Sequence, residues 1–282
     1  MASSSNKISG MAAGLVVLGG SRSARSTGVV WLVGAGPGDP ELMTIKASRV
    51  LASADVILHD ALISDAILAL APPSARRISV AKRKSRHSYA QVDINRLLVA
   101  FAREGLTVVR LKGGDPFIFG RGGEELEACR DAGILCQVIP GVSAALAAAA
   151  SAQAPLTHRG AAQSVTFVTA HATGGAEPDL DWSSLAKANQ TVVIYMGVSA
   201  AGRVAARLIE AGRDQQTSAL IVENASRPEE RRILTTLAGL ENAAQGLTGP
   251  ALLMVGEAMA LAQAIPATDA DMGPRQNLEA QS

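Results

Sequence analysis

The chain has 282 residues, of which 48% are hydrophobic and 3% aromatic, and its formal net charge is +1. This length accommodates two modest α/β domains or one large one. A near-neutral charge excludes the global basic field that holds a nucleic-acid backbone. No apolar run reaches the ~18 residues needed to span a bilayer. We therefore expect neither a nucleic-acid partner nor a membrane.

The two ends of the chain differ in composition from the rest. Residues 1–28 contain several serines and basic residues but no Asp or Glu. A signal or transit peptide has a similar composition, but the charge order is poor for either and no small-residue cleavage pattern stands out. We therefore interpret residues 1–28 as a disordered leader of a cytoplasmic protein. Residues 266–282 are polar and aperiodic, which predicts a disordered tail.

In the first half of the chain, short β-branched runs alternate with helical spacing of apolar residues. Strands are expected at 29–33, 56–59, 77–80, 106–111 and 135–139, and helices at 42–50, 63–70 and 94–101. This alternation predicts an α/β domain over 29–143, with a mostly parallel sheet that is covered by helices on both faces.

An alanine-rich helix at 144–152, capped by Ser143, marks the expected start of a second α/β domain that ends at residue 265. The expected elements that follow it are strands at 165–169, 191–196, 218–222, 232–235 and 252–255, a loop at 172–181 and a helix at 200–211. Short connections and an Arg-Pro turn predict antiparallel strand pairs in this half.

The first expected strand runs into a glycine-rich turn, GAGPGDP, at residues 34–40. A dinucleotide-binding loop needs a third glycine where Asp39 stands. Pro37 also removes a backbone N–H that a phosphate would use. The turn therefore allows a ligand to approach the backbone without forming a phosphate cradle. On this motif alone, a tight strand-to-helix turn without a ligand is the alternative.

A second glycine-rich segment, KGGDPFIFGRGGEE at 112–125, follows the expected strand 106–111. Ligands in open α/β sheets bind beyond the carboxyl ends of the strands, and Gly113 and Gly114 would let backbone groups face such a ligand. Glu124 and Glu125 are expected to be helix-start charges rather than catalytic groups.

Positive charge is concentrated at residues 76–87, which contain six Lys or Arg and no acid. In a protein that is otherwise neutral, such a patch suits a small polyanion better than a polynucleotide. Cys129 and Cys136 match no zinc spacing, and the four histidines form no known metal or catalytic pattern. We therefore expect no metal.

Five motifs together resemble the tetrapyrrole methylases. They are GAGPGD at 34–39, RLKGGDPFIFGRGGEE at 110–125, PGVSAA at 140–145, PLTHR at 155–159 and YMG at 195–197. The resemblance covers about 29–256 and implies two α/β domains of the tetrapyrrole methylase type, with the active site in the cleft between them, and a homodimer. Some relatives carry a dehydrogenase and ferrochelatase portion, for which residues 1–28 leave no room, so we expect the methyltransferase alone.

The second and fourth motifs favour the branch that methylates uroporphyrinogen III. The resemblance implies S-adenosyl-L-methionine as methyl donor, S-adenosyl-L-homocysteine as its product, and methylation at C2 and C7 to give precorrin-2 for sirohaem or cobalamin synthesis. The alternatives are a later corrin-ring (precorrin) methyltransferase and a non-catalytic tetrapyrrole-binding module.

The resemblance also assigns roles residue by residue. Cofactor contacts fall on Pro37, Gly113, Gly114, Asp115, Ile118, Ser143, Ala144, Met196, Ala225 and Ala251. Asp60 matches the proton acceptor and Lys82 the proton donor, with a loop cap and a solvated charge as the respective alternatives. The candidates for binding the substrate's carboxylates are Arg83, Arg121, His158 and Arg159, and for each of them a plain surface charge is the alternative.

Overall fold

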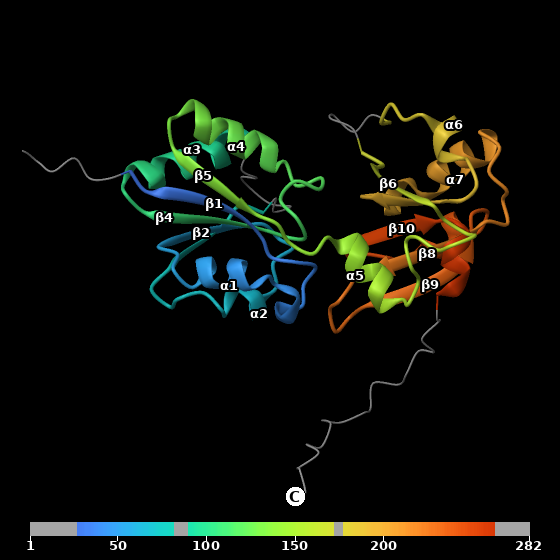
Figure 1. The fold of residues 1–282 in the computed structure, drawn as a ribbon, viewed down its shortest axis with the longest axis horizontal. Helices are drawn as coiled ribbons and strands as arrows, with labels where there is room; N and C mark the ends of the chain where they lie inside the picture. The colour runs from blue at the N-terminus through green and yellow to red at the C-terminus, as the bar shows by residue number, and fades with distance from the viewer. Residues whose placement is uncertain (1–26, 82–89, 172–176, 263–282) are drawn as a thin grey trace, which may run out of the picture.

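The computed structural model describes residues 27–81, 90–171 and 177–262 and has two lobes, each built around its own five-stranded sheet (Figure 1). Two α/β lobes confirm the predicted fold class. The expected tail lies outside the described residues, as do residues 1–26 of the expected leader. None of the helices in the described part of the chain is long and apolar enough to cross a membrane.

The first sheet is entirely parallel, with strand order β3-β2-β4-β1-β5. Its strands are β1 (Val29–Gly34), β2 (Val56–His59), β3 (Arg76–Ser79), β4 (Thr107–Lys112) and β5 (Leu135–Ile139). Each expected strand is confirmed to within one residue at either end. Because neighbouring strands are parallel, the carboxyl ends of β1, β4 and β5 lie at one edge of the sheet.

Helices cover both faces of this sheet, as predicted. They are η1 (Pro40–Leu42), α1 (Ile45–Leu51), α2 (Asp65–Leu68), α3 (Gln91–Arg103) and α4 (Gly122–Asp131). Val30 and Leu32 of β1 pack in the core with α3 and α4. Val33, on the opposite face of β1, packs in the core with α1 and α2. Burial on both faces explains the unbroken apolar run of β1.

Helix α2 is shorter than the helix expected at 63–70. Ser64 caps it by accepting a hydrogen bond from Ile67 N at 3.4 Å, so the helix begins only at Asp65. Two prolines, Pro72 and Pro73, follow closely and disfavour helical backbone before them. The apolar spacing was still informative, because Ile63 and Ile67 are both buried.

The second sheet has strand order β6-β7-β10-β8-β9. Its strands are β6 (Ser164–Thr169), β7 (Gln190–Tyr195), β8 (Ser218–Glu223), β9 (Arg231–Thr236) and β10 (Ala251–Val255). Three of the four pairings are antiparallel, as predicted, and β6 pairs with β7 in parallel.

Helices also cover both faces of the second sheet. They are α5 (Ala144–Ser151), α6 (Trp182–Leu185), η3 (Val198–Ala200), α7 (Ala201–Glu210), α8 (Leu240–Ala243) and η4 (Glu257–Leu261). Helix α5 packs on one face through buried alanines such as Ala145 and Ala148, whose small side chains allow a close approach. Its predicted cap is confirmed, since Ser143 Oγ accepts a hydrogen bond from Ala145 N at 3.4 Å. Within the expected loop 172–181, residues 172–176 lie outside the description, and 177–181 contain no helix or strand.

Strand β7 ends one residue earlier than expected. Met196 was predicted to be its last residue, but the structure ends the strand at Tyr195. Met196 has a φ of +55°, which is a left-handed conformation that cannot continue a strand. The expected strand end was therefore wrong by one residue, and Met196 occupies the turn beyond it.

At the carboxyl edge of the first sheet, three glycines bring separate segments into backbone contact. A Cβ added at Gly34 would lie 2.5 Å from Gly141 N and 2.7 Å from Gly114 O. A Cβ at Gly141 would lie 2.9 Å from Gly34 Cα and closer still to Gly114 O. These positions therefore admit only glycine at this spacing, and they fix the two glycine-rich segments against each other.

A buried charge cluster lies beneath the second glycine segment. Glu125 accepts from Arg110 Nε at 2.9 Å and pairs with Lys112 Nζ at 3.1 Å. All three residues are buried, with exposed fractions of 4% or less. Burial, followed by the charge of Arg110, lowers the pKa of Lys112, while Glu125 acts in the opposite direction.

Glu124 and Glu125 both lie in the first turn of α4, as predicted, and Glu125 also belongs to this buried cluster. Glu125 is fully buried and joins α4 to β4, whereas its neighbour Glu124 is exposed and pairs with Arg121. Arg110 and Lys112 are two residues apart on one strand and therefore project to the same face. Two cations on one face of a buried strand require a buried acid opposite them.

We predict that Gly141→Ala destabilises the fold by about 1–3 kcal/mol, because the added Cβ meets backbone that cannot move aside. Thermal denaturation measures the loss. Gly123→Ala is the matched control, since a Cβ there meets nothing within 4 Å. Equal stability of the two variants would contradict the close packing described above.

A second prediction compares the neighbouring residues Glu124 and Glu125, of which only Glu125 is buried. Glu125→Gln should lower the free energy of unfolding by about 3–5 kcal/mol, because two buried cations lose their charged partner. Glu124→Gln should cost less than about 1 kcal/mol, because its ion pair with Arg121 is exposed. Urea denaturation of both variants checks this order. A similar decrease in the free energy of unfolding for both variants would show that the buried cluster does not stabilise the fold.

Candidate functional site

The two glycine-rich segments form one surface at the carboxyl edge of the first sheet. Gly36 and Gly114 exchange backbone hydrogen bonds at 3.2 and 2.7 Å. Gly114 has a φ of +64°, which favours glycine. A Cβ added there would lie 3.7 Å from Ala144 N, which is ordinary van der Waals contact, so this segment lies against the start of α5. Predicted cofactor contacts from both segments, Pro37 and Gly113 among them, are thus brought to one edge.

The Asp115 carboxylate links two backbone segments at this edge through hydrogen bonds. Its Oδ1 accepts a hydrogen bond from Phe117 N at 2.8 Å, and its Oδ2 accepts one from Gly141 N at 3.1 Å. Ile118 N in turn bonds to Asp115 O at 3.3 Å. The carboxylate therefore holds its own loop and the segment that follows β5 in register. Its predicted contact with the cofactor stays a prediction, as does that of Ile118.

Asp60 lies beside the same loop. Its Oδ1 accepts a hydrogen bond from Leu62 N at 2.9 Å, and its Oδ2 accepts a longer one from Gly113 N at 3.4 Å. The first bond is the loop cap that was weighed as the alternative role. The second places the carboxylate next to the glycine loop, which the proton-acceptor role requires. Both roles are therefore compatible with the geometry.

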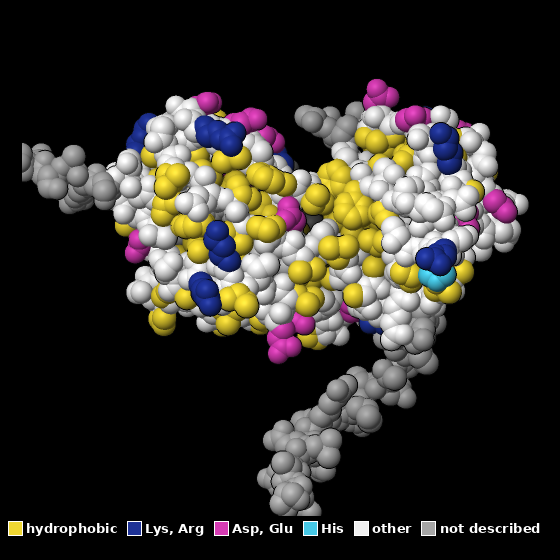
Figure 2. Space-filling model, viewed as in Figure 1, with side chains coloured by type: hydrophobic (Ala, Val, Ile, Leu, Met, Phe, Trp, Pro, Cys, Tyr) yellow, Lys and Arg dark blue, Asp and Glu magenta, His cyan; other side chains and the backbone are white. Residues whose placement is uncertain are grey.

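The second lobe meets this edge through Tyr195 at the end of β7. The phenol oxygen lies 2.5 Å from Ser143 Oγ and accepts from Ala145 N at 3.3 Å. Burial raises the pKa of Tyr195, although the Ser143 hydrogen bond opposes this. The Phe119 ring, from the second glycine segment, lies 4.9 Å from the Tyr195 ring. This aromatic contact joins the two lobes, and hydrophobic side chains gather where the lobes meet (Figure 2).

The remaining predicted cofactor contacts lie on the edge of the second lobe near Tyr195. Leu252 of β10 pairs with Tyr195, so Ala251 lies level with the turn that contains Met196. Ala251 also pairs with Glu223, the last residue of β8, and Ala225 follows two residues later. Met196 is 47% exposed, which leaves its thioether available to a ligand. The structure thus gathers these residues at the junction, together with Ser143 and Ala144.

A second contact between the lobes lies at the first glycine turn. Asp39 N donates to Ser226 Oγ at 3.3 Å, and Arg227 Nη2 donates to Leu62 O at 2.5 Å. Ser226 has a φ of +61°, so the turn after β8 is held in a left-handed conformation. Sequence reasoning singled out none of Arg227, Tyr195 and Phe119 as functional residues. Tyr195 and Phe119 lie inside recognised motifs, but no motif includes Arg227.

The predicted substrate-binding residues are dispersed. Arg121 binds Glu124 with two hydrogen bonds of 2.8 and 2.7 Å, so its charge already has a partner. This pairing raises the pKa of Arg121 and lowers that of Glu124. Lys82, the predicted proton donor, and Arg83 lie outside the described residues.

His158 and Arg159 lie in an exposed turn before β6. The next segment bonds to the start of β7, through Gln163 N and Asn189 O at 2.8 Å. That end of β7 is roughly 16 Å from Tyr195, since a strand rises about 3.3 Å per residue. Within one chain, the structure therefore does not bring these two residues to the other predicted site residues.

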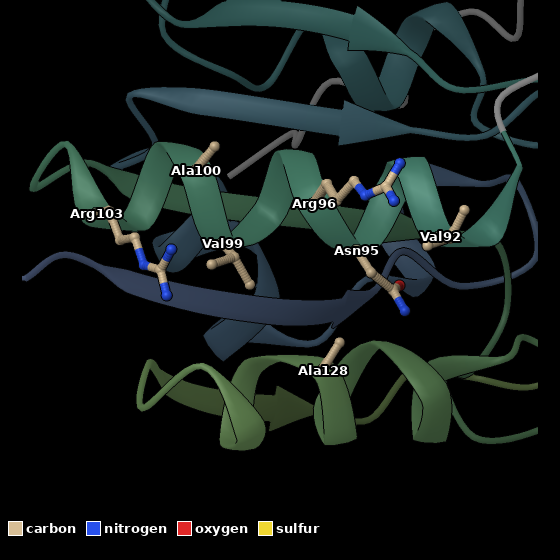
Figure 3. Close-up of a pocket in the computed structure, with 7 residues that line it drawn as sticks. All are labelled: Val92, Asn95, Arg96, Val99, Ala100, Arg103 and Ala128. Atoms are coloured by element: carbon tan, nitrogen blue, oxygen red, sulfur yellow. The ribbon is translucent and has the colours of Figure 1, made fainter.

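A separate groove of about 350 Å³ runs between α3 and α4 (Figure 3). Its walls are residues of α3 from Val92 to Arg103 and Ala128 of α4. This volume is at the small end of the range for ligand pockets, and the groove contains none of the predicted site residues. The junction of the two lobes therefore remains the candidate active site.

Comparisons with known proteins identify the family of the chain. The family model described as Tetrapyrrole (Corrin/Porphyrin) Methylases matches residues 29–241. "Siroheme synthase 3" of Aeromonas hydrophila is 51% identical over 239 residues, which are 85% of this chain and 51% of that protein. "Siroheme synthase" of Chromobacterium violaceum is 48% identical over 241 residues, which are 85% of this chain and 51% of that protein. The chain thus spans about half the length of the curated relatives it matches.

The chain also matches solved structures, and the match covers nearly the whole length of those proteins. Uroporphyrin III C-methyl transferase from Thermus thermophilus is 41% identical, with a TM-score of 0.72 and coverage of 83% of this chain and 94% of that one. The Thermus enzyme complexed with S-adenyl homocysteine is 42% identical, also with a TM-score of 0.72, and covers 82% and 93%. With a family model that matches most of its length and relatives this similar, the chain belongs to the tetrapyrrole methylases.

Proposed function

We propose that the chain is a uroporphyrinogen-III C-methyltransferase that uses S-adenosyl-L-methionine to methylate C2 and C7 and gives precorrin-2. The main support is the junction, where residues of both lobes line one edge. The Thermus relative with 42% identity, named as a uroporphyrin-III C-methyl transferase, holds S-adenyl homocysteine. The product feeds sirohaem or cobalamin synthesis. We also propose that the enzyme is a cytoplasmic homodimer.

The residues at the junction fit the methyl donor. Gly114 has no side chain and therefore lets a nucleoside lie against its backbone, and the half-exposed Met196 offers an apolar, polarisable contact. The carboxylates of Asp39, Asp60 and Asp115 make this edge acidic, which suits a sulfonium cation. Residues that would hold the donor are therefore Gly113, Gly114 and Asp115 from the first lobe, and Ser143, Ala144, Met196, Ala225 and Ala251 from the second.

When bound, S-adenosyl-L-methionine supplies the methyl group and its sulfur leaves as a neutral thioether. Because charge is lost at the sulfur in this step, a site that excludes water favours it. The contact between Phe119 and Tyr195 places two aromatic rings at the junction. The fixed glycine segments orient the reactants, since methyl transfer needs a spacing of about 3 Å between the methyl group and the ring carbon.

In our proposal, Asp60 is the proton acceptor. The ring carbon uses electron density from its pyrrole to form the new carbon–carbon bond, and the methylated macrocycle must then lose a proton. A carboxylate oxygen of Asp60 accepts this proton in our proposal. Its two backbone hydrogen bonds, from Leu62 N and Gly113 N, keep it at the edge of the glycine loop.

The direct test incubates the purified chain with S-adenosyl-L-methionine and uroporphyrinogen III under anaerobic conditions. Production of S-adenosyl-L-homocysteine, together with the absorbance of the oxidised dimethylated product, is expected. Saturable binding of the macrocycle without consumption of the donor would instead indicate a non-catalytic binding module. Turnover of a precorrin but not of uroporphyrinogen III would indicate a later methylation step.

We predict that Asp60→Asn lowers kcat by about 10²–10⁴-fold, because the amide cannot accept the proton as a base. The dissociation constant of S-adenosyl-L-homocysteine, measured by calorimetry, should change little. Asp65→Asn, on the exposed first turn of α2, serves as the control and should retain turnover. Turnover of Asp60→Asn near that of the unchanged enzyme would remove Asp60 from this role.

A further inference from the structure

The turn after β8 places an arginine of the second lobe on the first lobe. Arg227 Nη2 donates to Leu62 O across 165 residues of sequence. Its side chain also lies directly on Gly38, where an added Cβ would be 2.7 Å from Arg227 Cγ and 2.8 Å from Nε. The guanidinium is therefore held at the junction, over the first glycine turn.

Arg227 has spare hydrogen-bonding capacity. A guanidinium has five N–H donors, and the bond to Leu62 O uses one of them. Within the described residues, no ion pair includes Arg227, although other arginines of the second lobe are paired, such as Arg213 with Glu257 and Arg232 with Glu230. Arg227 is half-buried as a residue, and a guanidinium with free donors is suited to a carboxylate, which it can bind through two parallel bonds.

The acidic groups that the described residues place at the junction favour a cation there for an anionic substrate. The described edge of the first lobe carries Asp39, Asp60 and Asp115, which would repel a macrocycle with many carboxylates. Of the predicted carboxylate ligands in the described part of the chain, Arg121 is paired, and His158 and Arg159 lie at the far end of β7. Among the described residues, Arg227 therefore supplies positive charge at the junction where the predicted carboxylate ligands do not.

We propose that Arg227 binds a carboxylate of the tetrapyrrole substrate and so orients the macrocycle over Asp60. This inference rests on the proposed function. The macrocycle is favoured over the carboxylate of the methyl donor because the guanidinium is bonded to the backbone of Leu62, only two residues from the proposed proton acceptor. The substrate's carboxylate takes the free donors of Arg227, and no covalent step involves this residue.

The test compares Arg227→Gln with Arg227→Lys and with Arg103→Gln, a control on α3 that is remote from the junction. Arg227→Gln should raise KM for uroporphyrinogen III about 10-fold. This rise corresponds to the lower end of the free-energy range for losing a hydrogen bond to a charged group. Arg227→Lys should give a smaller rise, because it keeps the charge but loses the planar fork. Arg103→Gln should leave KM unchanged.

Two further measurements separate substrate binding from a purely structural role. The salt dependence of kcat/KM should become weaker in Arg227→Gln, because one ionic contact with the substrate is lost. The dissociation constant of S-adenosyl-L-homocysteine should stay within about twofold, a change of less than 0.5 kcal/mol. An unchanged KM, or a parallel loss of affinity for S-adenosyl-L-homocysteine, would overturn the proposal. Failure of the unchanged enzyme to bind that ligand would instead refute the proposed function.

Discussion

The site depends on the backbone contact among Gly34, Gly114 and Gly141. No side chain separates these three segments, so the ends of β1, β4 and β5 form a single rigid edge. The hydrogen bonds of Asp60 and Asp115 follow from that contact, because both carboxylates bond to amides of the same edge. A methyl donor that must be positioned within a fraction of an ångström needs such a fixed wall.

Charge is distributed in two layers around this edge. Below it, Arg110, Lys112 and Glu125 neutralise one another in part and tie α4 to β4, so the loop between them begins and ends on fixed elements. Above it, acidic side chains of the first lobe face the junction, and Arg227 of the second lobe crosses to it. The inner layer stabilises the fold, while the outer layer brings acidic groups of the first lobe and one arginine of the second lobe together at the junction.

Much of the architecture could be predicted from the sequence, because strands such as β1 and β2 are short apolar runs that stop at glycine or at a polar residue. The glycine segments follow two such strands, so they could be assigned to the carboxyl edge of the sheet. The burial of Glu125 could not, since it depends on two cations of another element that project toward it. The contact of Arg227 with the first lobe could not be predicted from the sequence either, because its partner Leu62 is 165 residues away and contributes only a backbone carbonyl. The left-handed turn at Met196 was also missed, because the apolar run of β7 continues into Met196 and a positive φ is uncommon for a residue other than glycine.

The most direct test of the central claim is a crystal structure of the chain with S-adenosyl-L-homocysteine. The account predicts the ligand at the junction of the lobes, against the backbone of Gly113 and Gly114 on one side and near Met196 on the other. A ligand bound in the groove between α3 and α4, or at any place that does not touch the glycine edge, would contradict it.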